Sequence, residues 1–185
     1  MSDTNNIHIN TEERLFYISD GIDRTSLGKI CFNLLYLLRI DDKKEEQQKN
    51  YTRQPISIFV NSFGGSVYDM WSLVDIIENS KTPIHTYCTG YAMSAGFIIF
   101  LAGHKRFVTK HATLMCHQLS MWDNGKLADM QTIMEEREDN QRDIEKFIRK
   151  QTKITQEKLD EIRIQKADWY IKSTNVEELG IAEVI

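Results

Sequence analysis

The chain contains two consecutive segments with the same pattern, in which an apolar strand ends near a glycine and a helix follows. In the first segment, residues 56–60 form the strand and Gly64-Gly65 breaks it. In the second, residues 84–88 form the strand, Gly90 supplies the turn, and residues 94–102 form a very apolar helix. Repeated units of this kind predict parallel strands joined by right-handed crossovers. We therefore expect an α/β fold whose mainly parallel sheet is covered by helices on both faces.

The remaining pattern fits one domain over residues 1–185, since two domains would each be small for their class. Residues 1–12 are a polar segment that precedes the first expected strand. The charged stretch 41–51 reads as an exposed loop or helix extension. Further strands are expected at residues 15–18, 106–109, 113–117 and 181–185, and further helices over 27–38, from Thr155, and from a Thr174/Glu177 capping box to Gly180.

A long charged helix is predicted from about residue 126 to residue 152, after a turn at 123–125. At 1.5 Å per residue such a helix is about 40 Å long, which exceeds the diameter of a compact domain of this size. We therefore expect it to protrude from the domain and to need a partner.

Composition excludes several classes of function. A net charge of −4 leaves no excess of positive charge for binding nucleic acid. No apolar stretch is long enough to cross a membrane, and no secretory signal or transit peptide is visible, so a cytoplasmic protein is the default expectation. Three widely spaced cysteines argue against a disulfide framework and give no zinc signature.

Ser94 lies between small residues where the second strand meets its helix. Small neighbours let a substrate carbonyl approach the hydroxyl, and a helix N-terminus offers unpaired N–H groups for an oxyanion. Gly64-Gly65 ends the neighbouring strand and could present backbone N–H groups to the same place. The alternatives are an ordinary N-cap serine and an ordinary strand-to-helix turn.

Five histidines are available as a general base, and His117 is the one at the carboxyl end of an expected strand, where catalytic groups collect in α/β sheets. A lone histidine there is more often structural. Composition cannot select a carboxylate partner among 27 acidic residues.

Three motifs, at residues 61–67, 90–96 and 115–118, occur together in an order and spacing that resemble the proteolytic subunit of the Clp protease (ClpP) family. The resemblance extends from Leu15 to the C-terminus. It implies a ClpP/crotonase-like fold of repeated ββα units with a protruding handle helix in the region 118–153. It also implies a Ser/His/Asp serine endopeptidase, with a catalytic triad of Ser94, His117 and Asp168 and an oxyanion hole formed by Gly65 and Ala95.

Members of this family assemble as rings of seven that stack into a closed chamber of fourteen subunits and degrade unfolded polypeptides. The resemblance therefore implies self-association and a ring-shaped AAA+ unfoldase as partner. It implies no cofactor or metal in this subunit, because the ATP is used by the partner.

The sequence departs from the family pattern near the expected site. Phe63 and Leu119 stand where the family usually has proline, and residues 119–123 replace a glycine-rich segment that lines the substrate groove. The chain starts about a dozen residues before its first expected strand, which suggests a reduced N-terminal axial loop and a divergent, accessory or phage-borne relative with altered ATPase coupling. Two alternatives stay open: a noncatalytic assembly subunit, and a crotonase-like acyl-CoA hydratase or isomerase.

Overall fold

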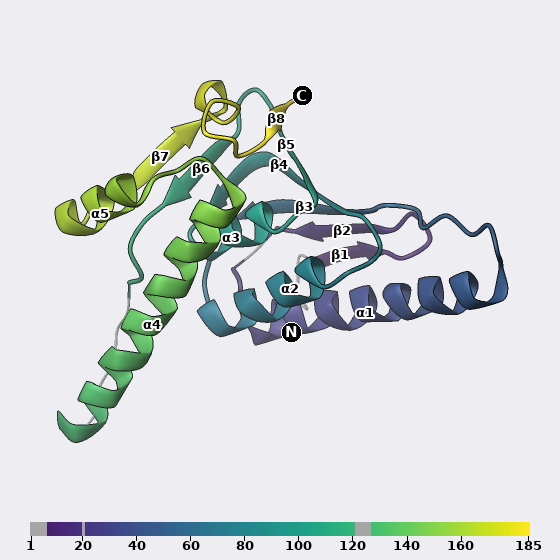
Figure 1. The fold of residues 1–185 in the computed structure, drawn as a ribbon, viewed down its shortest axis with the longest axis horizontal. Helices are drawn as coiled ribbons and strands as arrows, with labels where there is room; N and C mark the ends of the chain where they lie inside the picture. The colour runs from purple at the N-terminus through teal and green to yellow at the C-terminus, as the bar shows by residue number, and fades with distance from the viewer. Residues whose placement is uncertain (1–6, 20, 121–126) are drawn as a thin grey trace, which may run out of the picture.

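The computed structural model describes residues 7–19, 21–120 and 127–185, and these contain one eight-stranded sheet (Figure 1). The main path through the sheet runs β1-β2-β3-β4-β5-β8, while β6 pairs with β4 and β7 pairs with β6. The strands are β1 (Ile7–Asn10), β2 (Leu15–Ile18), β3 (Ile56–Ser62), β4 (Ile84–Met93), β5 (Lys105–Val108), β6 (Thr113–Cys116), β7 (Trp169–Lys172) and β8 (Glu183–Val184).

The sheet is mainly parallel, which confirms the predicted fold class. Strands β2, β3, β4 and β5 pair in parallel, and β4 also pairs in parallel with β6. The exceptions include β1, which pairs antiparallel with β2, and β7, which pairs antiparallel with β6. The polar segment 1–12 thus contains a strand that its composition did not indicate.

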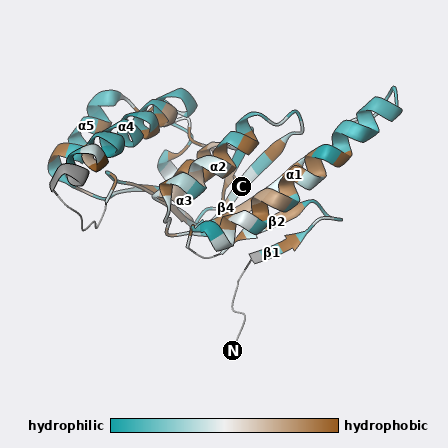
Figure 2. Ribbon diagram, turned by 90° about the horizontal axis from the view of Figure 1, so that it is seen from below, coloured by the Kyte–Doolittle hydropathy of each residue, from teal (hydrophilic) through white to brown (hydrophobic). Residues whose placement is uncertain are grey.

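Helices α1 (Arg24–Gln47), α2 (Val67–Glu78) and α3 (Ala95–Leu101) lie together on one face of the sheet (Figures 1 and 2). Side chains along β3 alternate between buried and half-buried, as expected when helices cover one face only. The expectation that helices cover both faces was wrong. The opposite face carries a row of aromatic rings from adjacent strands, whose centroids lie 4.8 to 6.1 Å apart: Tyr17, Phe59, Tyr87 and Phe107.

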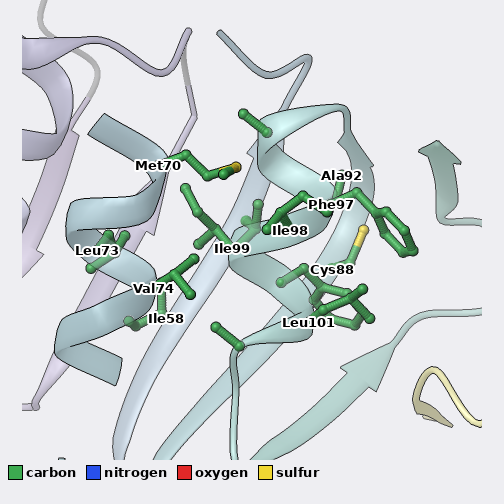
Figure 3. Close-up of a cluster of buried hydrophobic side chains, with 14 of the residues drawn as sticks. Ile58, Met70, Leu73, Val74, Cys88, Ala92, Phe97, Ile98, Ile99 and Leu101 are labelled. Carbon is green, nitrogen blue, oxygen red and sulfur yellow. The ribbon is translucent and has the colours of Figure 1, made fainter. Parts of the chain in front are cut away.

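The core lies between the sheet and α2 and α3 (Figure 3). Every residue of α3 is buried, which explains why this helix has no polar face. Burying one large aliphatic or aromatic side chain contributes about 1.5–3 kcal/mol, so α3 is fixed firmly against β3 and β4. Side chains that meet there are Ile58, Met70, Leu73, Val74, Cys88, Ala92, Phe97, Ile98, Ile99 and Leu101.

Helix α4 (Leu127–Gln151) confirms the predicted long helix, and its N-terminal part extends away from the sheet (Figure 1). Its last turns are anchored by Ile144, Phe147 and Ile148, which are buried. The turn expected at residues 123–125 lies outside the described residues. Helix α5 (Gln156–Gln165) follows and is N-capped by Thr155, as predicted.

The charged stretch 41–51 continues α1 through Gln47, but its first residue is not exposed as expected. Asp41 is fully buried and accepts hydrogen bonds from Arg14, Tyr51 and Thr82. Burial alone would raise the pKa of this carboxyl, but the hydrogen bonds and the guanidinium charge outweigh it and hold the pKa below its usual range. This network ties α1 to the loops before β3 and β4.

The C-terminal segment differs from the prediction. The Thr174/Glu177 pattern predicted an α-helix, whereas the chain forms only a 3-10 helix, Ser173–Asn175, followed by turns. Only five residues, 175–179, lie between Thr174 and Gly180, which is too few to stabilise an α-helix, whose first turn is costly to form. The closing strand β8 is also shorter than predicted. None of the described helices combines the length and apolar character needed to cross a membrane.

Candidate active site

Ser94 forms the junction between β4 and α3, with φ 52° and ψ −125°. A residue other than glycine in this region of backbone space stores about 1–3 kcal/mol of strain. The strain is held by packing and by the Ser94 N–H, which donates to the carbonyl of Met115 at 3.0 Å. The Ser94 side chain makes no capping bond, and its hydroxyl has no hydrogen-bond partner among the described residues. The ordinary N-cap interpretation therefore does not apply.

Gly90 does not supply the turn that the sequence suggested. Strand β4 continues through it to Met93, and the chain turns at Ser94 instead. A Cβ at Gly90 would lie 2.3 Å from Asn61 Oδ1, the atom that accepts a hydrogen bond from the Tyr91 N–H at 3.1 Å. Glycine is thus present because a side chain from the neighbouring strand fills this space.

The Gly64-Gly65 turn packs directly against this serine. Gly64 has φ 105°, and a Cβ there would lie 2.7 Å from the Cβ of Ser94. Gly65 is bridged to Ile22, and it lines the same cavity as Ser94 and Ala95. Ala95 is the first residue of α3, where backbone N–H groups have no partner within the helix. The predicted oxyanion-hole residues Gly65 and Ala95 therefore line the same cavity as the serine.

His117 and Asp168 are brought together by the pairing of β6 with β7. Cys116 lies opposite Trp169 in this antiparallel pair, so the residues just outside it, His117 and Asp168, face each other. His117 Nδ1 lies 3.9 Å from Asp168 Oδ1, which is longer than a hydrogen bond. The His117 side chain is 20% exposed and that of Asp168 is 52% exposed.

A cavity of about 400 Å³ lies between the serine junction, the glycine turn and the segment that follows β6, and Asp168 is not one of its lining residues. Ser94 and His117 both line it, although no hydrogen bond connects them within the described residues. The remaining walls are mainly apolar, and the cavity is lined by Phe63, Gly65, Val67, Met70, Ser94, Ala95, Phe97, Ile98, Met115, Cys116, His117, Leu119, Ser120 and Ile144.

Two positions where the sequence departs from the family pattern lie on this cavity. Phe63 is 68% exposed, and its ring packs on that of Tyr91 with centroids 4.2 Å apart. The Leu119 N–H donates to Gln141 Oε1 at 2.9 Å, a bond that proline could not make. Residues 121–123 of the altered groove segment lie outside the described residues.

Sequence reasoning missed Gln141 and Glu145, which connect α4 to this segment. The sequence carries no clear signal for this contact, because Glu145 lies beside the apolar stripe of Ile144, Phe147 and Ile148, in a helix rich in charged residues.

The fold is that of a mainly parallel α/β protein with ClpP-like topology. It matches the structure of a ClpP1 point mutant from Listeria monocytogenes with a TM-score of 0.78, at 24% identity, over 95% of this chain and 92% of that one. The profile of the Clp protease family matches residues 4–185. The chain belongs to the Clp protease family.

Two relatives show the extent of the similarity. The ATP-dependent Clp protease proteolytic subunit 1 of Shouchella clausii is 27% identical over 176 residues, which span 94% of this chain and 85% of that protein. The proteolytic subunit 1 of Prochlorococcus marinus subsp. pastoris is 30% identical over 126 residues. This second alignment spans 67% of this chain and 59% of the relative.

Proposed function

We propose that the protein is a serine endopeptidase whose nucleophile is Ser94. The observation that carries the proposal is the strained junction at Ser94, which leaves its hydroxyl without a hydrogen-bond partner among the described residues, on a cavity that His117 also lines. Strain of this kind persists where the surrounding structure holds it and is common at catalytic positions. Relatives named as ATP-dependent Clp protease proteolytic subunits support the same reaction class.

In the proposed mechanism, His117 takes the proton of the Ser94 hydroxyl, which attacks the carbonyl carbon of a peptide bond. The backbone N–H groups of Gly65 and Ala95 stabilise the oxyanion. His117 then protonates the leaving amine, and water hydrolyses the acyl-enzyme. Asp168 orients the imidazole, which requires the 3.9 Å separation to close to about 2.8 Å.

The proposal extends to assembly and partners. Rings of this chain, seven subunits each and stacked in pairs, would enclose the cavity in a chamber in the cytoplasm. An ATP-driven unfoldase would supply unfolded polypeptide, and the subunit itself would use no cofactor or metal. Native mass spectrometry measures the number of subunits. Degradation of an unfolded protein with and without unfoldase and ATP measures the coupling, and equal rates would contradict it.

A fluorophosphonate probe tests the nucleophile, because only an activated serine should react. Labelling should map to Ser94 by peptide mass spectrometry, and Ser94→Ala should abolish it and reduce peptidase activity by roughly four orders of magnitude or more. Ser120→Ala is the matched control, since Ser120 lines the same cavity and should leave labelling unchanged. Labelling that persists in Ser94→Ala would contradict the proposal.

The separation of Ser94 and Asp168 from His117 favours one alternative, a noncatalytic assembly subunit. Neither the Ser94 hydroxyl nor the Asp168 carboxylate is within hydrogen-bonding contact of His117 in the described structure. An assembled protein that forms rings but is not labelled by the probe would support this alternative.

A further inference from the structure

Helix α4 carries a buried carboxylate that the proposed mechanism does not use. Glu145 is 5% exposed and lies beside the buried Ile144 and Ile148. Among residues 7–19, 21–120 and 127–185, no cation forms an ion pair with it. Its partners are two side-chain amides: Gln141 Nε2 donates to Oε1 at 2.8 Å, and Gln156 Nε2 donates to Oε2 at 2.7 Å. Each carboxylate oxygen is thus matched by one amide donor.

The carboxylate fixes the orientation of the Gln141 amide. An ionised carboxylate can only accept hydrogen bonds, so the Gln141 NH2 group must point toward Glu145. The oxygen of the same amide then points the other way, where it accepts the Leu119 backbone N–H at 2.9 Å. The directions of the Gln141 and Leu119 hydrogen bonds therefore depend on a single acceptor in α4, whereas Gln156 Nε2 also donates to Asp160 Oδ1 at 3.1 Å.

This chain of hydrogen bonds ends beside the active-site cavity. Leu119 follows His117 by two residues, and both line that cavity. A second, small void is lined by Cys116, His117, Gln141 and Glu145 among others. Burial first, and the Glu145 charge second, raise the pKa of the Cys116 thiol to about 12, as expected from a carboxylate close behind β6.

We propose that Glu145 and Gln141 are positioning residues that hold the His117–Leu119 segment in place, so that the His117 imidazole stays beside Ser94. This inference rests on the proposed peptidase function. It assigns to α4 and α5 a role in placing the general base, because the acceptor lies in α4 and one of its donors, Gln156, begins α5. The anchor is available because residue 119 is leucine and carries the N–H that proline lacks.

Exchanging the two side chains gives a specific test. In Glu145→Gln, an amide with one oxygen faces two amide donors, so one bond is lost or Gln141 turns its NH2 toward the Leu119 N–H. In Gln141→Glu, two carboxylates face each other. In the double variant Gln141→Glu/Glu145→Gln, the new Glu accepts from Leu119 and from the new Gln, whose oxygen accepts from Gln156. All three hydrogen bonds are then restored at unchanged net charge.

Each single variant should lower kcat for a short peptide, and the rate of Ser94 labelling by fluorophosphonate, by about 10- to 100-fold, because a shift of about 1 Å at a catalytic group has an effect of that size. KM should change little, and the Leu119 amide should exchange its hydrogen faster. The double variant should recover kcat to within about threefold of wild type, which corresponds to a difference in activation free energy of less than about 1 kcal/mol. Glu138→Gln removes an exposed charge from the same helix and is the control.

Variants are compared at a temperature where urea unfolding and native mass spectrometry show them folded and assembled. Wild-type protein that is not labelled at Ser94 would overturn the proposed function, and the positioning role with it. If wild type is labelled but the single variants react equally fast, or the double variant stays as slow as they are, the positioning role is wrong while the peptidase proposal stands. A fall confined to KM would also contradict it.

Discussion

Replacing Gly64 by alanine tests the contact between the glycine turn and the serine. At φ 105° an alanine costs about 1–2 kcal/mol from backbone conformation alone. Its Cβ would also lie 2.7 Å from the Cβ of Ser94 and 2.8 Å from the carbonyl oxygen of Met93. Such overlap in a packed region adds about 1–3 kcal/mol. We therefore expect Gly64→Ala to lower the free energy of unfolding by about 2–5 kcal/mol.

The same substitution at Gly28 is the matched control. Gly28 lies in α1, and outside its chain neighbours and the backbone of its own helix no atom of the described residues lies within 4 Å of a Cβ added there. Gly28→Ala should therefore stabilise the protein by about 0.5–1 kcal/mol, the ordinary gain in a helix. Urea unfolding measures both changes. Fluorophosphonate labelling should also slow by about 100-fold in Gly64→Ala, because Ser94 is displaced. Wild-type stability and labelling in Gly64→Ala would refute the described packing.

Three further outcomes are expected. Asp41→Asn should lower the free energy of unfolding, measured by urea unfolding, by about 3–5 kcal/mol, because it leaves the Arg14 guanidinium without its buried partner. The control Asp42→Asn, at the exposed neighbouring position, should change the free energy of unfolding by less than about 1 kcal/mol. Because the pKa of Asp41 is lowered in the folded state, its carboxylate stabilises the fold above the ordinary value of 3.8, and acid titration should show this stabilisation lost as the pH falls through the lowered pKa. Burial raises the pKa of the Cys88 and Cys116 thiols to about 12, so iodoacetamide at about pH 8 should modify them only after unfolding, as mass spectrometry would record.

The periodicity of hydrophobic residues and the positions of turn residues were sufficient to predict most of the helices and strands. Strand β2 occupies the predicted residues 15–18, and α4 and α5 occur where their patterns indicated. The errors arise where a distant contact overrides a local signal. Gly90 resembles a turn in the sequence, but the Asn61 side chain and pairing with β6 keep it in a strand. Asp41 looks like part of an exposed charged run until its partners Arg14 and Thr82 are known.

The residues of the candidate site differ in how far the sequence alone could predict them. Local pattern alone made Ser94 and the glycine turn candidates, because a strand-to-helix junction places both at one edge of the sheet, but it left an ordinary N-cap serine and an ordinary turn as alternatives. His117 and Asp168 are separated by 50 intervening residues, and only the β6 and β7 pairing brings them together. Resemblance selected Asp168, which composition could not. The catalytic roles of these residues stay predictions.

The backbone at Ser94 has a consequence for sequence drift. Glycine would adopt φ 52° without penalty, so the serine persists there at a thermodynamic disadvantage of about 1 kcal/mol or more. A library selected for solubility and folding alone should therefore enrich glycine at this position, whereas a library selected for turnover should retain serine. The codon at this one site would then record which selection the population had experienced.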